Sequence, residues 1–160
     1  MRARRPLLLS SFLALLILSV DATPVSAQSP EDEVRAAIDQ LFDGMRAGDS
    51  TMVSAVFYEG AQMGRALNEG MRTRGIGGFL NAIGTPHDEV WDELIWDVKI
   101  HVDRRLASAW MEYAFYLGDN LHHCGVNSMQ FYRTDEGWKI AYLVDTDRGM
   151  DCDIPDDLKK

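Results

Sequence analysis

Two histidines, an asparagine and two aspartates lie where neighbouring strands could bring them together. His122 and His123 open a predicted strand that also carries Asn127, and Asp145 and Asp147 close the next one. A histidine facing a carboxylate could move a proton near neutral pH, which makes His123 and Asp145 a candidate catalytic pair. Because successive residues of a strand point to opposite faces, at most one of the histidines could enter such a site. The alternative is a hydrogen-bonded histidine at a strand start.

Simple alternation places His123 and Asn127 on one strand face. Asparagine is depleted in strands suited to a core, so a pocket amide that reads a ligand carbonyl or ring nitrogen would explain it. A hydrogen bond from Asn127 to a bulged backbone beside Gly125 would explain it equally well.

Glu112 is a third candidate acid or base because aromatic residues surround it in the sequence. A carboxylate among aromatic rings could have a raised pKa. Alternation gives the side chain even odds of pointing outward instead. The nearby aromatics Trp110, Tyr113 and Tyr142 are typical of a core, and they would also suit a flat, apolar ligand. With Asn127, they form the predicted ligand-binding set.

Residues 1–27 are typical of a secretory signal. Three arginines precede an apolar run from Pro6 to Val20, and the small-residue motif Val25-Ser26-Ala27 follows. The run is shorter than the roughly 20 residues that cross a bilayer, so we expect cleavage after Ala27 and export, into a periplasm. We therefore expect no membrane span after processing.

The net charge is −9 over 160 residues, and −11 once the three basic residues and one acidic residue of the signal are removed. Nucleic acids and anionic membrane surfaces attract basic patches, so this balance argues against both as partners. The remaining 133 residues suit one domain with a single core. We assign residues 28–148 to that domain and 149–160 to a C-terminal tail.

Cys124 and Cys152 are the two cysteines of the chain. An exported protein permits disulfides, and a bridge between them would pin the tail to a strand, at a gain of roughly 3–4 kcal/mol from chain entropy. A free catalytic thiol or a metal ligand is the less favoured interpretation, because neither cysteine has metal-ligand spacing to a histidine. The sequence carries no zinc motif, phosphate loop or nucleophile elbow, and we expect no cofactor.

The pattern of apolar residues predicts helices first and strands afterwards. Ser29, Pro30 and Asp32 can start a helix whose apolar stripe is Val34, Ile38, Leu41, Phe42 and Met45. Gly48 ends it and Asp49 caps a second, short helix. Phe57 to Leu67 predicts a short strand, the glycine-rich stretch 70–78 breaks the pattern, and Ile76 to Ile83 matches a short helix.

Four consecutive strands are predicted between Leu94 and Asp147. In the first, period-two alternation puts these apolar residues on one face: Leu94, Trp96, Val98, Ile100 and Val102. Helices followed by a strand meander predict an α+β fold, with the helices packed across the concave side of a strongly curved antiparallel sheet. The resulting cone is the natural ligand site.

Several of these segments resemble the nuclear-transport-factor-2-like superfamily, over roughly Glu31 to Asp147. The resemblance lies in Ala47-Gly48-Asp49 after the first helix and in Gly137-Trp138-Lys139-Ile140 at the last strand. The stretches 110–116 and 123–127, with Asp145-Thr146, are similar to a secreted bacterial branch described as lumazine-binding-like. The resemblance implies a cone-shaped pocket and often a sheet-to-sheet homodimer, but no particular chemistry.

Three functions are compatible with these observations. The first is a secreted module that binds a small apolar or aromatic molecule through Asn127, His123, Tyr113 and Asp145. The second is a cofactor-free isomerase, cyclase or dehydratase that uses His123 with Asp145, or Glu112, as acid and base. The third is a homodimeric assembly module with a filled, silent cone.

Overall fold

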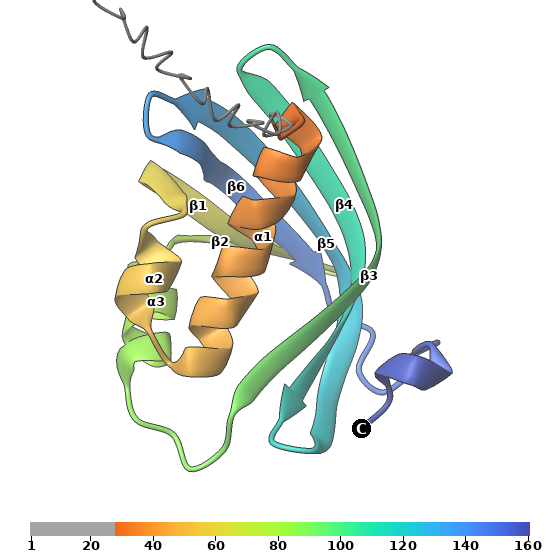
Figure 1. Ribbon diagram of the computed structural model, residues 1–160. Coiled ribbons are helices and arrows are strands. Elements are labelled where there is room, and N and C mark those ends of the chain that lie inside the picture. The colour runs from red at the N-terminus through yellow and green to blue at the C-terminus, as the bar shows by residue number, and fades with distance from the viewer. Residues whose placement is uncertain (1–27) are drawn as a thin grey trace, which may run out of the picture.

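The computed structural model describes residues 28–160, so the predicted signal at 1–27 lies outside the described residues. These described residues form three helices, six strands and one turn of 3-10 helix, arranged as in Figure 1. The elements are α1 (Pro30–Ala47), α2 (Ser50–Ser54), β1 (Phe57–Leu67), β2 (Gly70–Gly75), α3 (Gly77–Gly84), β3 (Trp91–Asp103), β4 (Leu106–Leu117), β5 (Asn120–Thr134), β6 (Gly137–Thr146) and the 3-10 turn Asp156–Leu158.

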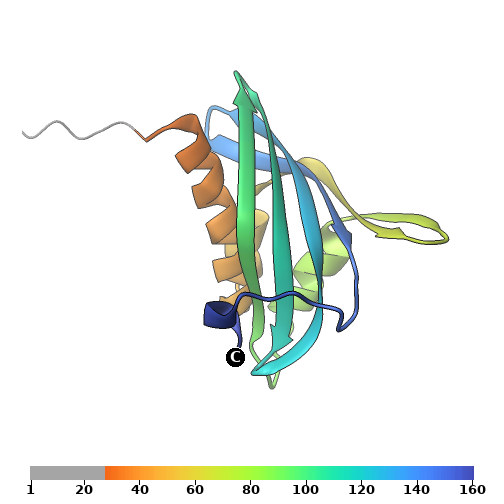
Figure 2. The same cartoon turned by 90° about the vertical axis from the view of Figure 1, so that its right-hand side faces the viewer.

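The six strands form one sheet in the order β2-β1-β6-β5-β4-β3. The sheet is strongly curved, and α1 crosses its concave side, with α2 and α3 beside it (Figures 1 and 2). The predicted α+β architecture is therefore confirmed. The sheet is mixed rather than purely antiparallel, because β1 runs parallel to β6. The sequence pattern also missed β2, which pairs with β1 as a hairpin.

Helix α1 is held as its sequence predicts. The Ser29 hydroxyl accepts from the Asp32 backbone N–H, and the Asp32 carboxylate accepts in return from the Ser29 N–H. Gly48 ends the helix with a left-handed φ of 66°, which glycine adopts at little cost. The predicted apolar stripe is buried against the concave face of the sheet: Val34, Ile38, Leu41, Phe42 and Met45.

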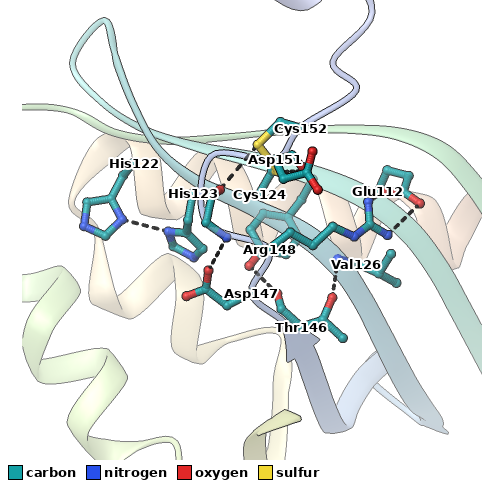
Figure 3. Close-up of a disulfide and its surroundings, with 12 residues drawn as sticks. Glu112, His122, His123, Cys124, Val126, Thr146, Asp147, Arg148, Asp151 and Cys152 are labelled. Atoms are coloured by element: carbon teal, nitrogen blue, oxygen red, sulfur yellow. Dashed lines mark hydrogen bonds and ion pairs between the residues drawn. A yellow bond between two sulfur atoms is a disulfide. The ribbon is translucent and has the colours of Figure 1, made fainter. Parts of the chain in front are cut away.

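A second apolar cluster lies on the outer, convex face, beneath the C-terminal tail. Ile154 and Leu158 of the tail pack with Tyr116 and Cys124 of the strands. The predicted disulfide between Cys124 and Cys152 is present and fixes the tail there (Figure 3). The tail thus covers part of a sheet face that would otherwise expose apolar side chains.

Two strand irregularities change which residues face the helices. Asp97 has a φ of 49°, and the pairing of β3 with β4 shifts between Trp96 and Lys99. Such a bulge adds one residue and reverses the alternation beyond it. Val98 packs in the main core, as predicted, whereas Leu94 and Trp96 pack under the tail on the outer face. The prediction that all five apolar residues of this strand share a face is therefore wrong.

The second irregularity lies at the start of β5. Phe115 pairs with His123 and Tyr116 with Leu121, so His122 is an extra residue without a partner on β4. His122 and His123 consequently lie side by side, with their Nδ1 atoms 2.8 Å apart (Figure 3). The prediction that the two rings point to opposite faces is wrong, because the extra residue interrupts the alternation.

Candidate functional site

A cavity of about 480 Å³ lies between the helices and the concave face of the sheet. Its lining is divided equally between apolar and polar side chains, and the polar ones gather along the strands. The apolar lining residues are Leu41, Phe42, Met45, Met63, Phe79, Trp91, Phe115 and Leu143; the polar ones are Arg65, Arg72, Thr73, Arg74, Glu93, His123, Asn127 and Asp145. This combination is typical of a site for a small molecule.

A row of polar side chains crosses four adjacent strands at one level of the sheet. Arg72 of β2 pairs with Arg65 of β1, Arg65 with Asp145 of β6, and Asp145 with Asn127 of β5. All four line the cavity. The register of the sheet, which brings together residues up to 80 positions apart in the chain, therefore builds this wall of the site.

Arg65 is the centre of the row. Its guanidinium donates to both oxygens of Asp145, with Nε at 3.1 and 3.0 Å, and its Nη1 donates to Asp147 at 2.7 Å. The hydrogen bonds to Asp145 raise the pKa of Arg65 most, and the charges of both carboxylates raise it further. Both carboxylates are thus engaged by one cation, and Asp145 is not a free base.

His123 is held by the same arginine. Nη2 of Arg65 lies 3.2 Å from Nε2 of His123. A guanidinium can only donate, so Nε2 must accept and the ring hydrogen sits on Nδ1, from which it points to His122. Burial, followed by the nearby charge of Arg65, lowers the pKa of His123. His123 is therefore a neutral ring whose two nitrogens are both occupied.

Glu93 and Asn127 form the other polar pair of the cavity. The Asn127 side-chain amide is 3% exposed and donates to the Glu93 carboxylate at 2.7 Å. Burial, opposed by this hydrogen bond and assisted by the charge of Asp145, raises the pKa of Glu93 to about 7. Glu93 is thus a carboxyl group in an apolar cavity that gains or loses its proton near neutral pH.

The end of β6 passes very close to β5 beside these residues. A Cβ on Gly125 would lie 2.1 Å from the Thr146 carbonyl oxygen, so only glycine admits this approach. The same oxygen accepts a hydrogen bond from the Tyr113 hydroxyl at 2.7 Å. Tyr113 is buried with its ring against His123, and it supports the site from behind the lining.

The structure brings three predicted site residues to the cavity and leaves three on the outer face. His123, Asn127 and Asp145 line the cavity. Glu112 instead forms an ion pair with Arg148 at 2.7 Å, on the outer face (Figure 3). Trp110 is 51% exposed, and Tyr142 has its hydroxyl 3.9 Å from the Met71 sulfur.

Two central residues were missed by sequence reasoning. Arg65 lies in a strand whose predicted neighbours gave no reason to single it out. Simple alternation predicted that Leu94 faces the core and that Glu93, its neighbour, faces outward. The bulge at Asp97 reverses this, so that Glu93 lines the cavity. The only feature of the sequence that could have indicated the left-handed conformation at Asp97 is an aspartate within an apolar run.

Comparison with solved structures identifies the architecture. An NTF2-like protein with a cystatin-like fold from Novosphingobium aromaticivorans superposes with a TM-score of 0.62 at 15% identity, over 73% of this chain and 80% of that chain. The fold is the nuclear-transport-factor-2-like (NTF2-like) fold. An NTF2-like superfamily protein from Salmonella enterica gives a TM-score of 0.61 at 18% identity, over 77% and 94% of the two chains.

A candidate dehydratase of the NTF2-like family from Streptomyces avermitilis is also similar, with a TM-score of 0.58 at 18% identity over 73% of this chain and 94% of that chain. No protein-family model and no curated protein matches the sequence. At these identities the likeness establishes the NTF2-like fold alone. Within residues 28–160, no helix is long and apolar enough to cross a membrane.

Proposed function

We propose that this NTF2-like domain binds a small apolar or aromatic molecule in the cavity and holds one of its polar atoms at Asn127 and Glu93. The observation that carries the proposal is a cavity of about 480 Å³, lined by eight apolar side chains, with a buried amide and a carboxyl in its wall. Such a cavity buries the body of a ligand, and the few polar groups set its orientation.

Protonation of Glu93 extends what the pair can recognise. A neutral carboxyl donates a hydrogen bond, whereas the ionised form only accepts. With its pKa raised to about 7, Glu93 can present either form near neutral pH. The pair is thus suited to a carbonyl, hydroxyl or ring nitrogen at the buried end of a ligand.

A second candidate function is acid–base catalysis without a cofactor, as in an isomerase, cyclase or dehydratase. Its support is Glu93, because a general base works best when its pKa lies near the working pH. Glu93 takes the place of the His123–Asp145 pair in this candidate, since Arg65 engages both of those residues. Glu112 is not part of it because it pairs with Arg148 on the outer face.

A function as an assembly module receives less support. The cone of such a module should be filled by its own side chains, whereas the cone of this protein contains an open cavity. A homodimer through the sheet remains a prediction. The outer face beyond the tail exposes Leu106, Trp110 and Tyr132, which could form such an interface. Export of the protein likewise remains a prediction, and the disulfide is compatible with it.

The test begins with native mass spectrometry of the protein purified from its own source, which detects a retained ligand. Binding is then measured with N-phenyl-1-naphthylamine, an uncharged aromatic probe whose fluorescence rises when it leaves water. We expect saturable binding that Met63→Trp abolishes by filling the cavity, and that Asn127→Ala weakens for the retained ligand. Trp110→Ala, on the outer face, is the matched control. Binding that survives Met63→Trp but is lost in Trp110→Ala would place the ligand outside the cavity and overturn the proposal.

A further inference from the structure

Two arginines of β2 stand at the open side of the cavity. Arg72 and Arg74 alternate with Thr73, lie opposite Arg65 and Met63 of β1, and line the cavity with them. The β1–β2 hairpin projects from the body of the sheet, on the side away from α1 (Figure 2). The cavity therefore has a cationic rim on the side away from Glu93.

The charges of these two arginines are poorly compensated by the protein. Arg65 is engaged by Asp145 and Asp147, but Arg72 has only a 3.5 Å contact with Glu69, in which both side chains are more than 70% exposed. Among residues 28–160, no carboxylate lies within ion-pair distance of Arg74. Exposed pairs of the Arg72–Glu69 kind contribute little.

The placement also has a cost. Arg72 stands directly opposite Arg65, and like charges in cross-strand pairs repel. A chain with a net charge of −9 and 25 acidic residues has many carboxylates available for its surface arginines. It leaves Arg74 without a carboxylate partner, and Arg72 with only its exposed contact to Glu69, where a ligand in the cavity would meet them.

We propose that the ligand is an amphiphilic organic acid, with an apolar or aromatic body in the cavity and an anionic group held by Arg72 and Arg74. Guanidinium groups bind carboxylate, sulfonate or phosphate oxygens through paired, charge-assisted hydrogen bonds. The arginines thereby orient the molecule, with its apolar body toward Glu93 at the opposite wall. This inference rests on the proposed function, because it needs the cavity to be occupied.

A pair of matched probes tests it. N-phenyl-1-naphthylamine is uncharged, and 8-anilinonaphthalene-1-sulfonate is the same skeleton with one sulfonate. We expect the sulfonate probe to bind more tightly at low salt, and Arg72→Gln/Arg74→Gln to weaken it about tenfold, or about 1.4 kcal/mol, while binding of the uncharged probe stays constant. Added salt should weaken only the sulfonate probe.

The control is Arg35→Gln/Arg104→Gln, which removes the same charge from residues outside the cavity lining. Near-ultraviolet circular dichroism checks that each variant keeps its tertiary structure. If both double variants weaken the sulfonate probe equally, or if neither does, the anion site is overturned while the cavity proposal stands. If neither probe binds the unmodified protein, or if Met63→Trp leaves both bound, the proposed function fails and this inference fails with it.

Discussion

The Asn127 amide on β5 reaches across β4 to the Glu93 carboxylate on β3, at 2.7 Å. The two residues belong to strands that are not neighbours in the sheet. Their contact is possible because both side chains rise from the concave face toward the cavity. A carboxyl group whose pKa is raised to about 7 is thereby fixed in position by an uncharged partner.

Glu93→Gln should flatten the pH dependence of stability between about pH 4.5 and 7. The folded state keeps the Glu93 proton up to about pH 7, whereas the unfolded chain loses it near 4.5. The native state thus binds more protons in this window, and the free energy of unfolding falls as pH rises, by about 1–3 kcal/mol. Urea titrations at several pH values measure the slope. The control is Glu112→Gln, and an equal slope change in both variants would contradict the assignment to Glu93.

His123 should titrate below the ordinary histidine pKa of about 6.5. The unfolded chain then binds more protons below that value, so His123 contributes a loss of stability as pH falls through 6.5. Nitrogen-15 NMR of the imidazole rings gives the midpoint and the tautomer, with His123→Gln for assignment. A midpoint above 6.5, or a hydrogen on Nε2 in the neutral ring, would refute the arrangement around Arg65.

Arg65→Met should destabilise the fold by about 2 kcal/mol, because it leaves the half-buried Asp145 carboxylate without its cation. Adding Asp145→Asn should restore part of this loss, with a coupling of about 1 kcal/mol or more. Chemical denaturation of the two single variants and the double variant measures the coupling. Arg35→Met is the control, since its ion pair with Asp39 is exposed and worth about 0.3–0.5 kcal/mol. Equal losses in the two arginine variants would show that Arg65 has no special role.

Gly125→Ala should cost more than about 2 kcal/mol, because the new methyl group would collide with the backbone carbonyl of Thr146. The Tyr113–Thr146 hydrogen bond would be strained as well. Thermal unfolding measures the loss. Gly75→Ala is the matched control, because nothing lies within 4 Å of its added Cβ. Comparable stability of the two alanine variants would mean that β6 does not need the close approach.

Replacing both Cys124 and Cys152 by serine should lower the free energy of unfolding by about 2–4 kcal/mol, given a closed segment of 28 residues. The tail should then detach from the outer face and become sensitive to protease while the sheet stays folded. Limited proteolysis with mass spectrometry detects cleavage after Gly149. The unmodified protein without reductant is the reference, and an equally resistant tail in both would show that Ile154 and Leu158 hold it without the bridge.

Much of the fold was predictable because local signals and packing agree. The capping residues Ser29 and Asp32 and the stripe of α1 specify the helix from its own sequence. The two cysteines had only each other as partners. The strand β2 was missed because its residues are exposed and carry no apolar alternation. Strand β2 is stabilised by its pairing with β1, and the residue pattern of an isolated segment does not predict such pairing.

The candidate site was predictable only where the alternation of a strand is unbroken. Within β5 it holds from His123 to Asn127, and both line the cavity; Asp145 of β6 pairs with Asn127 and lines it as well. At Asp97 and His122 an inserted residue exchanges the side chains that face the cavity with those that face away. Predictions that extend strict alternation across such a residue are therefore wrong. Glu93 was lost for this reason, and Arg65 was not recognisable before the parallel pairing of β1 with β6 was known.

The inserted residue at His122 also connects the cavity wall to the outside. His123 donates its only ring hydrogen to the exposed His122 and accepts one from Arg65, so a chain of hydrogen bonds runs from the charged wall of the cavity to a ring at the surface. A backbone irregularity of one residue thus gives the buried end of the cone a hydrogen-bonded connection to solvent.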